Sequence, residues 1–97
     1  MNIRYHKLVQ RDFSRAVGYY RTVANDSIAE KFESSFRQMV RQAAAYHERF
    51  HFDKSGLRRA NMAEFPWHFL FRVRSSDILI IVLRHDKRHP GYGMNRE

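Results

Sequence analysis

The side chains best suited to chemistry on a phosphate lie near the carboxyl end of the chain, in the segment His85–Tyr92. This segment holds two histidines, a lysine, an arginine and a tyrosine. A histidine titrates near neutral pH and can move a proton, while cations hold a phosphate and the charge that grows on it during a reaction. We therefore take His85, Arg88 and Tyr92 as candidate catalytic residues and Lys87 as a candidate phosphate ligand. A solvated basic tail has the same composition, so that interpretation also stays open.

A second candidate group lies on two predicted strands, residues 57–62 and 65–74. Side chains alternate between the two faces of a strand, which puts a row of aromatic residues on one face and His68 and Arg72 on the other. The aromatic face offers more apolar area and should pack against helices. On the earlier strand, Arg59 and Asn61 share a face. The set predicted to bind phosphate is Arg59, Asn61, His68, Arg72 and Lys87.

The turn at Ser75-Ser76 sets the register of the last two strands, and with it the position of these side chains relative to the tail. If these two serines form a two-residue turn, Leu70 lies opposite Ile81 and His68 lies opposite Leu83. His85 then follows on the same side as His68. A slip of one residue would invert this arrangement.

Simpler explanations exist for the same side chains. His68 has the character of a half-buried histidine bonded to backbone, and Arg72 near a strand end can serve to discourage edge pairing. The chain has six histidines but no cysteine, and near the histidine-rich tail only Asp86 offers a carboxylate. We therefore expect no metal site and no cofactor.

The charge balance points to an anionic partner. Eighteen lysines and arginines face ten acidic residues, which gives a net charge of +8, and fourteen of the eighteen are arginine. Arginine has a planar fork that grips phosphates and stacks on bases. A basic domain of this size meets either a nucleic acid or an acidic protein, unless its basic surface is merely solvated.

The periodicity of apolar residues predicts the elements that position these groups. Weak alternation near residues 3–8 indicates a strand, and a three-and-four spacing from Arg11 to Ala24 indicates a helix. Ser27 and Glu30 have the spacing of a capping box for a second helix, which continues to Ala43. Strands follow at 57–62, 65–74 and 77–84.

The order β-α-α-β-β-β is that of an α+β fold, with a helix hairpin on one face of a small, mainly antiparallel four-stranded sheet. Residues 1–97 form one domain. The longest apolar run, Ile78–Leu83, is too short to span a membrane, and the chain fits a cytoplasmic protein.

With this order, the chain resembles the RelE/ParE superfamily of bacterial toxins, which includes plasmid stabilisation toxins. The resemblance covers nearly the whole chain and rests on an ordered set of segments: Gly56–Arg59, Phe65–Val73 and Ile80–Arg88. It implies the toxin component of a type II toxin–antitoxin pair, neutralised by a cognate acidic antitoxin.

The superfamily divides by target, and the chain has features of both branches. RelE-like members cut mRNA in the ribosome, and Tyr92 matches their tail tyrosine. Arg59 and Asn61 fall where that branch prefers lysines, His68 falls where it has an arginine, and Asp86 falls where its strand-end arginine is expected. ParE-like members poison DNA gyrase without a nuclease site, and the ending His85-x-x-Arg88 is similar to theirs.

The number of arginines, the histidines and Tyr92 incline the interpretation towards a ribosome-dependent mRNA endonuclease. His85 or Tyr92 would act as base or acid, and Arg59, Arg72 and Arg88 would stabilise the charged phosphorane. The alternative is a gyrase poison that uses the same basic surface for docking. A third is a toxin-like fold that only occupies an antitoxin.

Overall fold

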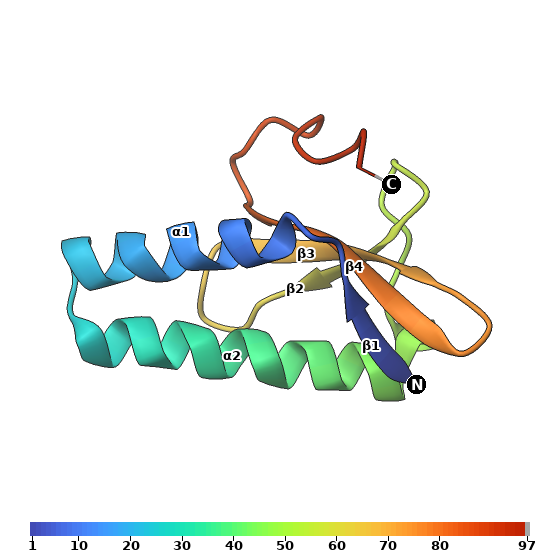
Figure 1. Ribbon diagram of the computed structural model, residues 1–97, viewed down its shortest axis with the longest axis horizontal. Helices are drawn as coiled ribbons and strands as arrows, with labels where there is room; N and C mark the ends of the chain where they lie inside the picture. The colour runs from blue at the N-terminus through green and yellow to red at the C-terminus, as the bar shows by residue number, and fades with distance from the viewer. Residues whose placement is uncertain (97) are drawn as a thin grey trace.

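The computed structural model describes residues 1–96 and places two helices against one face of a four-stranded sheet (Figure 1). The predicted α+β class and the predicted order of elements are confirmed, with one short 3-10 turn added after the second helix. The elements are β1 (Asn2–Tyr5), α1 (Val9–Val23), α2 (Asp26–Ala45), η1 (His47–Arg49), β2 (Arg58–Asn61), β3 (Trp67–Val73) and β4 (Asp77–His85).

The sheet has the strand order β1-β4-β3-β2, so the last strand lies inside the sheet and β1 and β2 form its edges. β1 runs parallel to β4, because the helix hairpin carries the chain across one face before it returns. The other pairs are antiparallel, as predicted for most of the sheet. β4 has an apolar run because both of its faces are covered, with Ile78, Ile80 and Leu83 in the helix-side core and Ile81 and Val82 on the other side.

The helices form an antiparallel hairpin (Figure 1). Their apolar stripes pack against the aromatic face of β3. Phe32 and Phe36 on α2 contact the rings of Trp67 and Phe69 edge to face. The predicted capping box is wrong: the residue that caps α2 is Asn25, two residues before the expected Ser27. The Oδ1 atom of Asn25 accepts the Ile28 N–H at 2.8 Å, and this bond caps the helix.

A β-bulge in β4 changes the predicted pairing of the last two strands. The register of a two-residue turn holds from Val73↔Ile78 to Phe71↔Ile80 and then shifts, so that Leu70 lies opposite Val82. The prediction that Leu70 faces Ile81 and His68 faces Leu83 is therefore wrong. The bulge inserts one residue into β4. Beyond the bulge, each residue of β3 therefore pairs with the β4 residue one position later than predicted.

This shift decides which side chains share a face at the end of β4. His68 lies opposite Arg84, and the two are buried together on the face away from the helices. His85 lies opposite Trp67, and its ring packs against the indole at 5.4 Å on the helix side. The prediction that His85 follows His68 on one side is wrong for the same reason.

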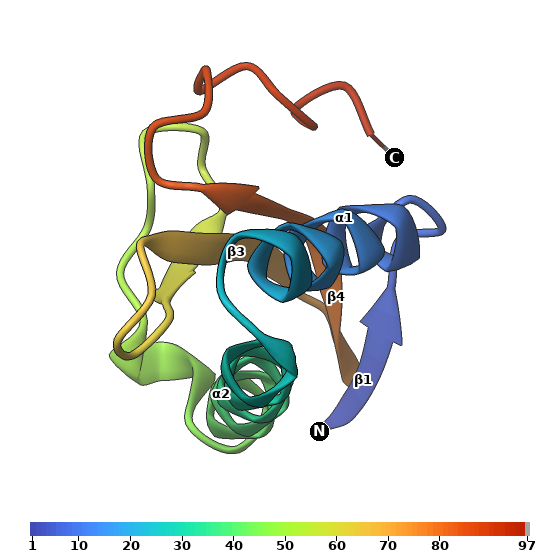
Figure 2. The ribbon, with the colours of Figure 1, turned by 90° about the vertical axis from the view of Figure 1, so that its left-hand side faces the viewer.

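The tail after β4 covers the second face of the sheet. Figure 2 shows it in red, on the side of the sheet away from α2. Tyr92 and Met94 pack on a small apolar cluster that includes Leu70 and Val82. Gly93 makes this approach possible: its φ is 82°, and a Cβ there would lie 2.6 Å from a methyl carbon of Val82.

A buried ion pair fastens the tail to α1. The Arg96 guanidinium donates to Asp12 Oδ2 at 2.6 Å, and the two side chains are 4% and 1% exposed. The same carboxylate accepts the Leu83 N–H at 3.2 Å and the Tyr92 hydroxyl at 3.1 Å. These bonds to Asp12 raise the pKa of Arg96 above its usual value. One carboxylate thus joins α1, β4 and the tail.

We predict that Asp12→Ala lowers the free energy of unfolding by about 3–5 kcal/mol, because it leaves a buried guanidinium without its partner. Arg96→Met should have a similar effect. The double variant Asp12→Ala/Arg96→Met should lose much less than the sum, since no unpaired charge remains. Urea unfolding of the four proteins measures the coupling energy.

The exposed pair Arg21–Asp26, at 3.1 Å, is the matched control. Its coupling should stay below about 1 kcal/mol. Equal coupling energies for the two pairs would contradict the special role of Asp12.

Candidate functional site

A chain of polar contacts crosses the sheet where β2, β3 and β4 meet. Arg84 Nε donates to His68 Nε2 at 3.0 Å, and His68 Nδ1 lies 2.8 Å from Asp86 Oδ1. Arg59 reaches the same oxygen at 3.5 Å, and its Nε donates to Asn61 Oδ1 at 2.9 Å. The structure thus brings together three members of the predicted phosphate-binding set, Arg59, Asn61 and His68.

The hydrogen bonds determine the protonation of His68. A guanidinium can only donate, so Nε2 must accept and the proton lies on Nδ1, which donates to Asp86. Burial lowers the pKa of His68 below its usual 6.5, and the positive charges of Arg59 and Arg84 add to this effect against the opposing bond to Asp86. His68 is therefore a neutral structural link, with both nitrogens engaged.

Arg84 is a charged residue that the sequence patterns did not single out. Its side chain is buried, and its Nη1 atom donates to the carbonyl oxygens of Pro90 at 2.7 Å and Tyr92 at 2.9 Å. Burial lowers the pKa of Arg84. No carboxylate oxygen within residues 1–96 forms a direct ion pair with it. Arg84 positions the tail above the sheet.

The three predicted catalytic residues line one small cavity of about 70 Å³ at the end of β4. The other walls come from α1 and β3 and include Asp12, Arg15 and Trp67. The Arg88 guanidinium lies 4.1 Å from the centre of the Tyr92 ring, and Arg96 lies 5.3 Å from it. Arg15 and Arg88 are exposed, so the cavity mouth is positively charged.

Within this cavity, the acid–base groups are held by other contacts. The Tyr92 hydroxyl donates to Asp12 Oδ1 at 3.1 Å. His85 Nδ1 accepts the Lys87 N–H at 3.0 Å, and its ring packs against Trp67. The cavity can hold a small anion between arginines, but it offers a phenol that is already bonded to a carboxylate.

Two predicted phosphate ligands lie apart from this group. Arg72 is exposed on β3, opposite Leu79 and four residues along the strand from His68. Lys87 is exposed in the turn that follows β4. Asp12 and Arg96, which hold the tail, were missed because they are distant in sequence and match no motif. Only an acidic residue on the apolar side of the first helix hinted at Asp12.

Within residues 1–96, no group of three histidine, aspartate or glutamate side chains is arranged to hold a metal ion. No helix there is both long and apolar enough to cross a bilayer.

The lowered pKa of His68 predicts an acid-sensitive fold. The unfolded chain binds a proton at this histidine more readily than the folded protein does, so the free energy of unfolding should fall as the pH drops below about 6.5, at up to ~1.4 kcal/mol per pH unit. The contribution is fully present above that pH. His68→Gln should flatten this dependence between pH 8 and pH 5, as measured by urea unfolding.

His51→Gln is the matched control, because His51 is exposed. Its pH profile should run parallel to that of the original protein. A His68→Gln profile that is also parallel would show that the histidine is not held neutral.

Comparison with known proteins identifies the family. The model of the ParE toxin of the type II toxin–antitoxin system parDE matches residues 3–90. No curated protein matches the chain in sequence. A solved structure described as the chromosomal ParDE TA system from P. aeruginosa has a TM-score of 0.77 at 16% identity, covering 88% of this chain and 95% of that one, and it supports the fold alone. On the strength of the match over residues 3–90, the chain belongs to the ParE family of type II toxin–antitoxin toxins.

Proposed function

We propose that the protein acts as a toxin by binding DNA gyrase, without a catalytic step of its own. The observation that carries this proposal is the engagement of the groups that a nuclease would need. Both nitrogens of His68 are bonded, and the Tyr92 hydroxyl is held by the carboxylate that anchors the tail. A general base must be within reach of the proton that it removes and must be able to accept it. The match to the ParE family model supports the same target.

A ribosome-dependent mRNA endonuclease is the second candidate, and one observation favours it. His85, Arg88 and Tyr92 line one cavity beside Arg15, so the candidate acid–base groups and the cations lie together. In such an enzyme His85 would move the proton, and the arginines would stabilise the phosphorane. This mechanism requires Tyr92 or His85 to leave its present contacts when RNA binds.

We expect the purified toxin to inhibit supercoiling by gyrase and to leave mRNA intact on translating ribosomes. Controlled expression should produce DNA damage and filamentation, and His85→Ala should keep both effects. Cut mRNA that depends on ribosomes, and that disappears in His85→Ala, would instead establish the endonuclease.

The antitoxin needs a docking surface, and the β1 edge offers one. A hollow of about 280 Å³ lies between the end of β1 and the helix hairpin, lined by Tyr5, Val9, Phe13, Phe36 and Arg37 among others. Tyr5 is 49% exposed, and the Arg37 guanidinium lies 5.5 Å from the centre of the Phe13 ring. We propose that an acidic carboxy-terminal segment of the cognate antitoxin, disordered alone, folds into this hollow.

Charge reversal at Arg37 and Arg41, both exposed on α2, tests this docking surface. Steering by charge acts mainly on the encounter, so Arg37→Glu/Arg41→Glu should slow antitoxin association by about tenfold and change dissociation much less. Stopped-flow or surface-based kinetics at low salt measures both rates. Lys54→Glu/Lys87→Glu, which changes the net charge by the same amount at exposed positions in the loop before β2 and the turn after β4, should leave association within about twofold. Equal slowing by both changes would mean that only net charge matters.

A further inference from the structure

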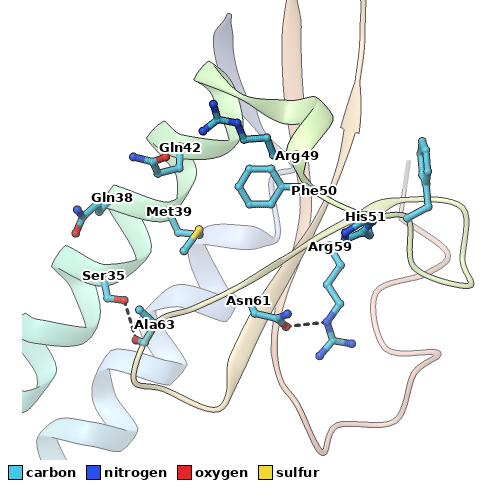
Figure 3. Close-up of a pocket in the computed structure, with 11 residues that line it drawn as sticks. Ser35, Gln38, Met39, Gln42, Arg49, Phe50, His51, Arg59, Asn61 and Ala63 are labelled. Carbon is cyan, nitrogen blue, oxygen red and sulfur yellow. Dashed lines mark hydrogen bonds between the residues drawn. The ribbon is translucent and has the colours of Figure 1, made fainter.

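A hollow of about 640 Å³ lies apart from the cavity at the end of β4 and from the antitoxin hollow, although it shares Arg59 and Asn61 with the polar chain described above. It lies between α2 and the outer edge of β2, and Figure 3 shows its walls. Gln38, Met39 and Gln42 project from α2 on one side, while Arg59 and Asn61 stand on β2 on the other. We call this hollow the β2 groove.

The backbone of β2 presents hydrogen-bonding groups to the β2 groove. The Met62 N–H donates to the Trp67 carbonyl at 2.9 Å, so Met62 faces β3, whereas the Arg59 N–H donates outward to the His51 carbonyl at 2.9 Å. Because these directions alternate along a strand, the N–H and C=O of Asn61 also point outward. β2 is an edge strand whose first half already pairs with His51–Asp53 through the Phe52↔Arg58 bridge. An extended peptide can therefore pair with the outward groups of Asn61, beyond this bridge.

The two sides of the β2 groove differ in chemistry, and the difference specifies the peptide. Met39 and Phe50 form an apolar floor on the helix side, and Phe52 is 65% exposed at the rim. Arg59 lies on the opposite side of β2 from the buried Ala60. Side chains of an added strand also point alternately to the two faces of the sheet. Every second side chain of the peptide would therefore contact the apolar floor, and the side chains between them would contact the Arg59 guanidinium.

The positive charge around the β2 groove requires the peptide side chains on the Arg59 side to be acidic. Arg49 and Arg59 line it, and no aspartate or glutamate of residues 1–96 does so. Arg59 also forms ion pairs with Asp53 and Asp86 outside the groove, whereas Arg49 has no carboxylate within ion-pair distance in this part of the chain. The whole chain carries a net charge of +8. Single-stranded nucleic acid would also satisfy the charge, but its phosphates only accept hydrogen bonds and cannot pair with the outward C=O of Asn61.

We propose that the β2 groove binds an extended segment of alternating acidic and apolar residues in the protein that the toxin attacks, as a strand added to β2. This inference rests on the proposed function as a binding toxin. The argument for the target, and against the antitoxin, is position: the antitoxin hollow lies at the β1 edge, and β2 is the opposite edge of the same sheet. Both surfaces can therefore be occupied at once.

The first test uses a labelled octapeptide of alternating glutamate and valine and fluorescence anisotropy. The toxin alone and the toxin–antitoxin complex should bind it with affinities within about threefold, since the two sites are at opposite edges of the sheet. An octapeptide of lysine and valine should not bind. If the toxin–antitoxin complex fails to bind the octapeptide, the antitoxin is the occupant of the groove. If an eight-nucleotide thymidine strand displaces the octapeptide, the occupant is a nucleic acid. Either result overturns the proposal.

The second test removes the backbone bond. Asn61→Pro removes both the asparagine side chain and the outward backbone N–H, whereas Asn61→Ala removes the side chain but keeps the N–H. The proline variant should therefore bind the octapeptide about tenfold more weakly than the alanine variant. In case the proline disturbs the fold, the peptide itself is changed. One octapeptide is N-methylated at every valine amide and a second at every glutamate amide. Only one of the two should lose binding, because alternate backbone amides of a strand point in opposite directions. Equal binding by the proline and alanine variants, together with equal binding of the two methylated peptides, would overturn strand addition.

The third test connects the β2 groove with toxicity. Arg49→Glu should weaken octapeptide binding about tenfold and reduce gyrase inhibition by a similar factor while keeping antitoxin affinity, and the exposed change Arg11→Glu on α1 should do neither. Loss of antitoxin affinity in Arg49→Glu would overturn the assignment to the target. If the toxin cuts mRNA instead, the function proposed above fails, whereas octapeptide binding by the purified protein is measured independently of it.

Discussion

A strand that is apolar at nearly every position must be covered on both faces, and this constraint on β4 shapes the rest of the molecule. The helix hairpin covers one face with Phe32, Phe36 and their neighbours. The other face would be exposed in a chain with only two helices, because its apolar residues Ile81 and Val82 need a second layer. The tail supplies that layer, and the carboxylate of Asp12 holds it in place by accepting bonds from β4 and from the tail together.

The same constraint explains why the polar groups at the end of β4 serve structure. A tail that is neither helix nor strand forms only turn hydrogen bonds within its own backbone, and Arg84 adds to these by donating to two further tail carbonyls. A buried guanidinium needs acceptors, and His68 provides one only as a neutral imidazole. Asp86 then fixes the proton of that imidazole. Side chains that look like acid–base machinery in the sequence are thus used to hold an irregular segment on a sheet.

Periodicity in the sequence was sufficient to predict the layers, because both helix stripes and the aromatic alternation of β3 extend over several repeats. It correctly placed Phe69 and Phe71 toward the helices, and it grouped Arg59, Asn61 and His68 on the other face. Periodicity failed to predict the register at the end of β4, because a single inserted residue changes which side chains share a face. The bulge at Ile81 has no marker such as glycine, and it places Arg84 instead of His85 on the polar face. The contacts of Asp12 were also beyond reach, since they join residues that are about seventy to eighty positions apart.

The two edges of the sheet then acquire different characters from the order of the strands. β1 is an edge because the hairpin crosses over to a parallel neighbour, and it ends beside exposed aromatic and basic side chains. β2 is an edge because the chain turns back after it to form β3 and then β4, and the outward N–H and C=O of Asn61 lie beside the amide side chains of α2. A toxin must be recognised by two partners, one that it attacks and one that restrains it. A mixed four-stranded sheet with its last strand inside has two chemically distinct edges, and these can serve both partners without competition.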